Sequence, residues 1–341
     1  MNEPTSYVAS SFITMLLFIL TPVVVATAVS PRAFLEGLGT CSVGGTYSVM
    51  PIVNNYVLDF NFHVDRICSG FETLSGDCVD RSTFHTQILN AVYEARIRAS
   101  LATQLPKRTS GIATVAIYKD AKEDEMCISA LYTAVNISTY TSMSPWPRFV
   151  ADVHYFQRSR PNVKDMMWPK TRKIIESRRM HSSIDESLLL RKNINSFDDA
   201  FTEGLVSNFF IIDNDYNVMT CPNSFVLPGS MSKIVKNICI DCGFNVIERP
   251  PLLSEIRQWK SAFLVSSSKP IWILKGLYLP SQCEQVYDGH KANYYSLLGQ
   301  YDKRSNEIII SIQQKLSKLF MDAVDGRHPK EIFGTSWSLI G

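Results

Sequence analysis

Residues 160–268 constrain the fold most, because short apolar runs there alternate with turns marked by proline and glycine. The sequence Leu-Pro-Gly at 227–229 precedes residues 230–242, which have helical spacing and are followed by Gly243, typical of the position just past a helix C-terminus. The apolar runs at 203–213 and 262–268 are typical of buried strands. The second half of the chain is therefore predicted to alternate strands with short helices.

The first half predicts a separate, smaller domain. It begins with a hairpin at 44–67, followed by a helix at 82–104. The apolar residues of that helix are expected on one buried face, namely Ile88, Leu89, Val92, Tyr93, Ile97 and Leu101. The prolines near residue 145 predict an irregular connection. The predicted divisions are a leader at 1–30, a small domain at 31–143, a connection at 144–150 and a large domain at 151–341.

Composition limits the class of protein. The chain has 341 residues, of which 45% are hydrophobic, so it can bury a full core in two domains. A formal net charge of +2 indicates no overall field for nucleic acid. The eight cysteines are scattered and favour a reducing compartment, cytoplasmic or organellar. No metal site is predicted.

An apolar leader at residues 12–29 leaves a different location open. The stretch carries no charge and ends in a small-residue pattern like a signal cleavage site. The preceding residues include a glutamate and no lysine or arginine, which is unlike a secretory signal. A signal, a membrane anchor that gives membrane contact, and a part of the fold all stay open.

The ordered motifs of the middle segment together resemble a known family. Glu-Gly at 203–204 with Ser-Asn-Phe-Phe at 207–210, the Leu-Pro-Gly turn, Glu-Arg at 248–249 and the strand ending in serines are similar to the class IV aminotransferases. That family uses pyridoxal 5'-phosphate and includes branched-chain and D-amino-acid aminotransferases and aminodeoxychorismate lyase. The resemblance covers roughly residues 33–280. It implies a two-domain α+β protein of fold type IV, with a small α/β N-terminal domain, a larger domain with a β-barrel-like core, and a homodimer.

The resemblance implies one lysine that forms a Schiff base with the cofactor aldehyde. Lys164 and Lys170 both lie in the right region. Lys164 is chosen because its distance along the chain to the strand beginning at Glu186 fits the family, as does its spacing to Trp168. Without that context, a lysine near a polar loop would be a solvated surface residue.

The family places a carboxylate at the cofactor's ring nitrogen, and Glu203 matches it, with Asn208 as a further cofactor-binding residue. A strand-end glutamate on the surface is the alternative for Glu203. The phosphate is expected at the helix that follows Gly229, on the backbone N–H groups of Ser230 and Met231.

The serines at the end of the following strand, Ser267 and Ser268, are expected to add donors to the phosphate. In the first domain, His63-x-x-Arg66 resembles a family motif whose arginine grips the phosphate. His63 itself is expected to be a packed residue. Tyr47 is a weaker candidate for the substrate pocket.

The chain departs from the family at four positions. Met50 and Pro51 stand near where relatives often have an arginine for the substrate, and Met231 and Ser232 replace a threonine and an arginine. The expected function is transamination of an amino acid or a lyase reaction on an aminodeoxychorismate-like substrate. The departures support one alternative, a catalytically inactive protein of the same fold, membrane-associated through residues 12–29.

Overall fold

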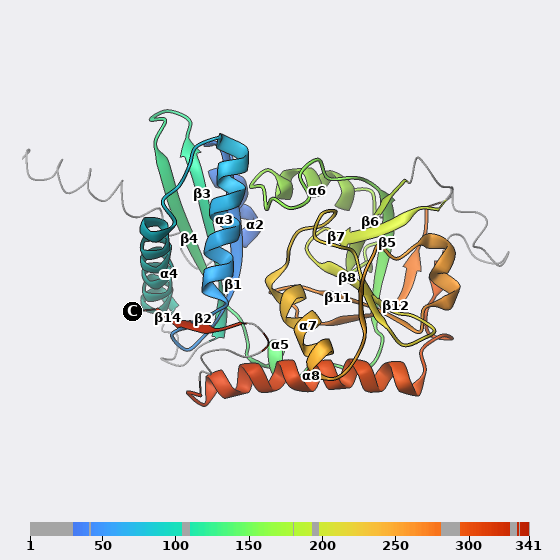
Figure 1. Ribbon diagram of the computed structural model, residues 1–341. Coiled ribbons are helices and arrows are strands. Elements are labelled where there is room, and N and C mark those ends of the chain that lie inside the picture. The colour runs from blue at the N-terminus through green and yellow to red at the C-terminus, as the bar shows by residue number, and fades with distance from the viewer. Residues whose placement is uncertain are drawn as a thin grey trace, which may run out of the picture. The chain divides into compact units, whose positions relative to one another are not determined.

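The chain forms two compact units (Figure 1). The computed structural model describes residues 30–40, 42–103, 110–179, 181–192, 198–280, 294–327, 333 and 335–340. The first unit comprises the described residues of Met1–Val135 with Lys164–Pro169 and Trp337–Gly341, and the second unit comprises those of Asn136–Val163 and Lys170–Ser336. This division differs from the predicted one, because residues 144–150 lie inside the second unit and Lys164 belongs to the first.

The first unit is built on an antiparallel sheet with the strand order β14-β2-β1-β3-β4. Its elements are α2 (Pro31–Leu38), β1 (Ser42–Val53), β2 (Tyr56–Leu58), α3 (Phe60–Ser75), α4 (Arg81–Thr103), β3 (Ser110–Asp120), β4 (Met126–Ala134) and β14 (Trp337–Leu339).

Alternation along the strands gives this sheet two buried faces, because successive side chains of a strand point to opposite sides. Met50 and Ile52 of β1 join the core under α3 and α4. The other face carries Tyr47, which packs in a smaller cluster with Phe34 and Leu35 of α2. Both faces are covered, which explains the apolar character of β1 and β3.

Two predictions for this unit need correction. The predicted second strand of the hairpin ends at Leu58, and the chain then enters α3 through Asp59, whose φ of 54° is in the left-handed region. The helix α4 forms as predicted, but Tyr93, Ile97 and Leu101 are exposed. They make a second apolar row at helical spacing, separate from the buried row that includes Ile88 and Val92.

A short segment, residues 164–166, pairs with the edge of β1 that β2 leaves uncovered. The N–H of Tyr47 donates to the carbonyl of Lys164 at 2.9 Å, and the N–H of Met166 donates to the carbonyl of Gly45 at 2.9 Å. A Cβ on Gly45 would lie 2.6 Å from the Met166 sulfur and the Ile117 carbonyl oxygen. The close approach of this segment to β1 therefore requires glycine at 45.

The second unit contains the larger sheet. Its elements are α5 (Ser138–Thr141), β5 (Phe149–Tyr155), most of α6 (Trp168–Glu176), β6 (Glu186–Arg191), β7 (Ala200–Gly204), β8 (Asn208–Ile212), β9 (Val218–Thr220), α7 (Ser230–Asp241), β10 (Val246–Glu248), the 3₁₀-helix η1 (Leu253–Gln258), β11 (Ser261–Val265), β12 (Trp272–Tyr278), β13 (Tyr294–Ser296) and α8 (Lys303–Val324).

Six of these strands close into a ring in the order β8-β11-β12-β5-β6-β7, and the pairing of β7 with β8 completes it. Aromatic and aliphatic side chains fill the ring, including Phe201, Phe209 and Trp259. The predicted barrel-like core is therefore confirmed. The predicted strand at 203–213 is wrong in one respect, because residues 205–207 turn the chain and separate β7 from β8.

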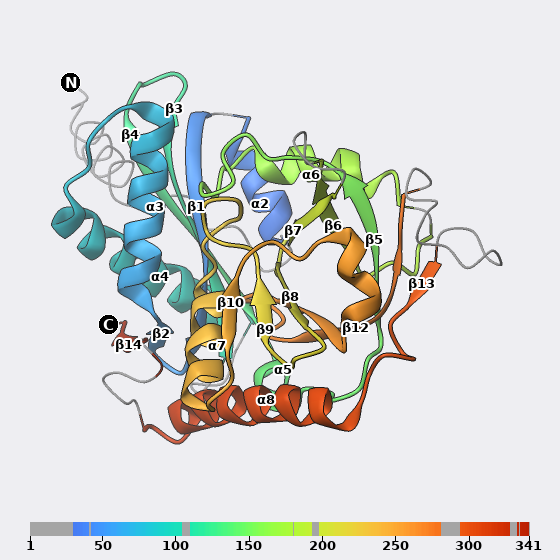
Figure 2. The same cartoon turned by 45° about the vertical axis from the view of Figure 1, so that its right-hand side comes forward.

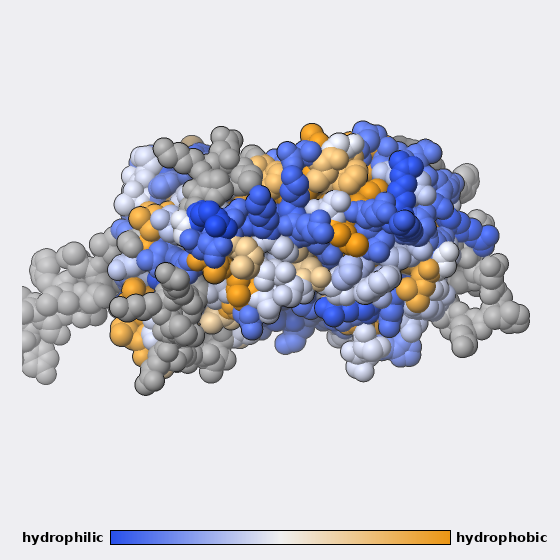
Figure 3. Space-filling model, turned by 90° about the horizontal axis from the view of Figure 1, so that it is seen from below, coloured by the Kyte–Doolittle hydropathy of each residue, from blue (hydrophilic) through white to orange (hydrophobic). Residues whose placement is uncertain are grey.

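The long helix α8 lies along the second unit, and α7 packs against it (Figure 2). On the buried side of α8, the ring of Phe320 stacks on that of Tyr140, with ring centroids 4.2 Å apart. Seen from the side of α8, hydrophilic residues predominate and hydrophobic residues form small separate groups (Figure 3). Scattered apolar side chains of this kind are ordinary on a protein surface.

Among the residues that the structure describes, no helix combines the length and the apolar character needed to cross a membrane. The predicted leader at residues 12–29 lies outside the described residues, as do residues 193–197.

The close packing at Gly45 gives a test of the first unit. Gly45→Ala is expected to lower the free energy of unfolding by roughly 1–3 kcal/mol, because the new methyl group meets backbone and side-chain atoms at 2.6 Å. Gly44→Ala is the matched control, since a Cβ there meets nothing within 4 Å. Urea unfolding of both variants measures the difference, and equal midpoints would contradict this account of the segment.

Candidate functional site

Glu203, at the end of β7, is a buried carboxylate with two partners. Its Oε1 accepts a hydrogen bond from Nη1 of Arg158 at 2.8 Å, and its Oε2 accepts one from the N–H of Leu227 at 3.0 Å. The side chains of Arg158 and Glu203 are only 8% and 5% exposed. A charge so far from water requires a partner of opposite sign, and this pair supplies it.

Sequence reasoning missed Arg158. It follows β5, and its Nη2 donates to the carbonyl of Val163 at 2.7 Å, so the guanidinium is held at two nitrogens. Arg158 and Glu203 are 45 positions apart. Nothing local in the sequence marks the pair, and an arginine in a polar stretch would by default be a surface residue.

Asn208 holds the same turn from the other side. Its Nδ2 donates to the carbonyl of Leu227 at 2.8 Å. The N–H of Leu227 is bound to Glu203, so both polar groups of this residue are fixed by predicted site residues. A Cβ on Gly229 would lie 2.0 Å from Oδ1 of Asn208, which explains the glycine that opens α7.

The N-terminus of α7 carries the positive end of the helix dipole. The first hydrogen bond of the helical pattern runs from the N–H of Lys233 to the carbonyl of Gly229. The N–H groups of residues 230–232 come before it, in the first turn, where N–H groups have no acceptor within the helix. Gly229 makes no side-chain cap. The hydroxyl of Ser230 lies 3.4 Å from that of Ser267, whose carbonyl accepts a hydrogen bond from Tyr140 at 3.0 Å.

The other predicted phosphate donors contribute differently. Ser268 is exposed, and its hydroxyl lies 3.3 Å from that of Ser266 rather than beside Ser230. Met231 and Ser232 are buried, at 1% and 6% exposure. Their substitution for the family's threonine and arginine therefore removes side-chain groups and leaves the backbone N–H groups of the helix start in place.

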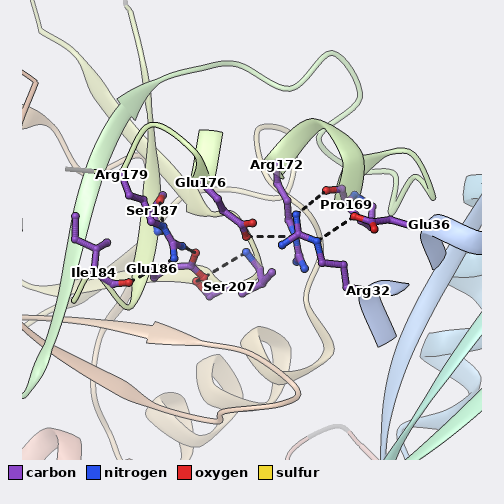
Figure 4. A network of polar contacts seen from close by, with 11 residues as sticks. Arg32, Glu36, Pro169, Arg172, Glu176, Arg179, Ile184, Glu186, Ser187 and Ser207 are labelled. Atoms are coloured by element: carbon purple, nitrogen blue, oxygen red, sulfur yellow. Dashed lines mark hydrogen bonds and ion pairs between the residues drawn. The ribbon is translucent and has the colours of Figure 1, made fainter. Parts of the chain in front are cut away.

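A second buried carboxylate, Glu186, lies beside Ser207 in the turn between β7 and β8 (Figure 4). Glu186 accepts hydrogen bonds from the N–H of Val206 at 3.3 Å and from the hydroxyl of Ser207 at 3.2 Å. Burial raises the pKa of the Glu186 carboxyl, while these donors and the guanidinium of Arg179 oppose that rise. Glu186 therefore fixes the β7–β8 turn.

The two candidate lysines lie in different units, Lys164 in the first and Lys170 in the second, and they have different surroundings. Lys164 is partly buried on the segment that pairs with β1, and its Nζ lies 5.0 Å from the centre of the Tyr47 ring. Tyr47 is 6% exposed and belongs to the cluster beside α2. Lys170 is exposed on α6. Of the two amines, that of Lys164 lies over an aromatic ring and that of Lys170 belongs to an exposed side chain.

Arg66 lies on α3 of the first unit. Its Nη2 donates to the hydroxyl of Ser48 at 2.6 Å, and its guanidinium lies 5.3 Å from the centre of the Phe62 ring. Burial lowers the pKa of Arg66 to about 10, while Tyr47 and Asp59 raise it, so the side chain is cationic at neutral pH.

The departures in β1 are structural. Met50 is fully buried in the core under α3, where an arginine could not be accommodated, and Pro51 is buried opposite Ile112 of β3. Met50 faces away from Tyr47, and Pro51, which shares the face of Tyr47, has no charged group, so neither position supplies a cation there.

A sequence model of one family, described as Amino-transferase class IV, matches residues 45–276. The comparison with curated protein sequences gives no match.

Solved structures share the fold at low sequence identity. The branched-chain amino acid aminotransferase from Escherichia coli has 13% identity and a TM-score of 0.61, with 93% of this chain and 94% of that chain covered. A hypothetical aminotransferase from Mycobacterium tuberculosis, in a PLP-bound form, has 11% identity and a TM-score of 0.60, with 87% and 94% covered. The branched-chain aminotransferase from Thermoproteus uzoniensis with norvaline has 15% identity and a TM-score of 0.56, with 92% and 94% covered.

The buried ion pair gives a prediction for stability. Arg158→Met is expected to lower the free energy of unfolding by about 3–5 kcal/mol, because it leaves the Glu203 carboxylate buried without its cation. Adding Glu203→Gln should recover part of that loss, since the amide is neutral and still offers an oxygen to Leu227. Both are measured by chemical unfolding.

The matched control is Arg98→Met, which breaks an exposed pair with Glu94 and should cost less than about 1 kcal/mol. If the Arg158 and Arg98 variants lose equal stability, the buried pair does not have the importance assigned to it.

Proposed function

The chain belongs to the amino-transferase class IV family, and from this we propose that it is a pyridoxal 5'-phosphate-dependent aminotransferase acting on an amino-acid-type substrate, with Lys164 as its reactive amine. One observation carries the proposal, namely that Glu203 and Asn208 converge on Leu227 at the turn that opens α7. This arrangement sets a carboxylate and a helix N-terminus at fixed positions within one unit, as a pyridine ring with a phosphate tail requires.

The residues of the second unit fit the chemistry of the cofactor. A carboxylate offers about four lone pairs, so Glu203 can accept a further hydrogen bond from a ring N–H beside those from Arg158 and Leu227. The start of α7 and the hydroxyls of Ser230 and Ser267 suit a phosphate. These donors remain although Met231 and Ser232 depart from the family, which favours an active protein over an inactive one.

The chain's own groups have separate tasks in the reaction. When bound, the cofactor supplies a ring that withdraws electrons from the substrate α-carbon. Lys164 would hold the cofactor covalently through its aldehyde, and its amine, released when the substrate amine takes its place, would move the proton at that carbon. Glu203 would keep the ring nitrogen protonated, and the guanidinium of Arg66 would bind oxygens of the phosphate.

The reaction type and the oligomeric state are part of the same proposal. Transfer of the amino group to a keto acid is the proposed reaction, and a lyase acting on aminodeoxychorismate would differ by releasing pyruvate without any keto-acid acceptor. A homodimer is the proposed assembly, and light scattering of the purified protein tests it.

The choice of lysine is tested by the visible absorbance of the bound cofactor. Lys164→Ala, incubated with pyridoxal 5'-phosphate and then desalted, is expected to lose the absorbance band of the lysine-bound cofactor and at least about 10²-fold in transaminase activity. Lys170→Ala, the control with an exposed lysine, should keep both.

Two results would overturn the proposal. Wild-type protein that stays colourless after incubation with the cofactor would reject the cofactor assignment. A band that persists in Lys164→Ala and disappears in Lys170→Ala would transfer the reactive amine to Lys170. Single amino acids offered to the coloured wild-type protein then identify the substrate through the change in its spectrum.

A further inference from the structure

A buried group of three polar side chains lies beneath α3 and is here named the Arg66 cluster, consisting of Ser48, His63 and Arg66. Ser48 comes from β1, and both other residues come from α3. The hydroxyl of Ser48 lies 2.8 Å from Nδ1 of His63 and accepts from Nη2 of Arg66 at 2.6 Å. Ser48 and His63 are each fully buried. The same Nη2 lies 3.3 Å from Nδ1 of His63.

The directions of these hydrogen bonds follow from the chemistry of the groups. A guanidinium has donors only, so the Ser48 oxygen must accept from Arg66. The hydroxyl proton of Ser48 can then be directed to Nδ1 of His63, 2.8 Å away. Arg66 Nη2 is a second donor near the same atom. Both contacts are satisfied when Nδ1 of His63 is an acceptor.

The cluster fixes one end of the Arg66 guanidinium. Ser48 and His63 both engage Nη2, and the Phe62 ring lies 5.3 Å from the guanidinium carbon. Ser48 is on a central strand and His63 is in the first turns of α3, so neither can follow a moving arginine. An arginine held in this way loses less freedom when it binds an anion than a solvated arginine does.

We infer that Ser48 and His63 are positioning residues that hold Arg66 ready for the phosphate of the cofactor. Ser48 contacts Arg66 directly, and His63 orients the Ser48 hydroxyl by accepting a hydrogen bond from it at Nδ1. This inference rests on the proposed role of Arg66 as the phosphate clamp. On this inference His63 does more than fill the core, because its Nδ1 orients the hydroxyl of Ser48.

The test measures affinity with two compounds that differ only in the phosphate. Full-length protein freed of cofactor is titrated by calorimetry with 4'-deoxypyridoxine 5'-phosphate and with 4'-deoxypyridoxine. Neither has an aldehyde, so neither depends on Lys164. Ser48→Ala is expected to weaken binding of the phosphate ester about tenfold, the range for one lost hydrogen bond to a charged group, and to leave the other compound unchanged within about twofold.

Variants at His63 separate its task from its bulk. His63→Asn offers an amide oxygen close to the position of Nδ1 and should keep most of the affinity for the phosphate ester. His63→Leu has similar size without an acceptor and should lose affinity as Ser48→Ala does. These two also serve if Ser48→Ala fails to fold.

Ser129→Ala is the matched control, because Ser129 is equally buried in the same sheet and its hydroxyl lies 3.2 Å from that of Tyr118 instead of near Arg66. It should leave both affinities unchanged. Equal losses for the two compounds in Ser48→Ala would show general damage and overturn the inference.

Arg66→Ala separates the inference from the proposed function. If it selectively loses the phosphate ester while Ser48→Ala and His63→Leu do not, the clamp stands and the positioning role falls. If wild-type protein binds neither compound, or if Arg66→Ala has no selective effect, the proposed phosphate clamp fails and the inference fails with it.

Discussion

The buried ion pair between Arg158 and Glu203 is the interaction on which the second unit's site depends. Removing a carboxylate from water is costly unless a cation and hydrogen-bond donors replace the water, and Arg158 with the N–H of Leu227 does this for Glu203. Because the second oxygen of Glu203 is bound to Leu227, the same charge also fixes the turn before α7. The electrostatics of the carboxylate and the position of the helix start are therefore set together.

Close backbone approaches make this arrangement rigid. At Gly229 and Gly204 a Cβ would lie 2.0 Å from Asn208 Oδ1 and 2.2 Å from Ser207 Oγ, respectively, so the chain is packed against polar side chains without space for a methyl group. Glu186 holds the turn between β7 and β8 from the side of β6. Polar groups that are satisfied in this way specify one conformation, which a site for a planar cofactor needs.

The parts of the fold that depend on local signals are predictable from the sequence. The helix α7 starts after Leu-Pro-Gly and stops before Gly243, whose φ of 77° is in the left-handed region that glycine favours. The turn at 205–207 is concealed because Leu205 and Val206 continue an apolar run, and its support comes from Glu186, distant in sequence. A periodic pattern likewise could not show which apolar row of α4 is buried.

The candidate site is predictable to a similar extent. The order of the motifs identifies Lys164 and Glu203 as candidates because the resemblance supplies their context. Arg158 and Ser48 could not be found in this way, because each acts through a contact with a residue that is 45 or 18 positions away. Contacts of this kind depend on which strands and helices become neighbours, and a single sequence does not state that.

The last described strand has a consequence for how the chain is made. β14 pairs with β2, so the sheet of the first unit gains its edge from residues Trp337–Leu339. The ribosome has therefore synthesised the chain as far as Leu339 before this sheet can be completed, and Lys164–Pro169 join the same unit from within the sequence of the other. No single cleavage of the chain yields both units intact, so separate expression of either one would require a redesigned connectivity.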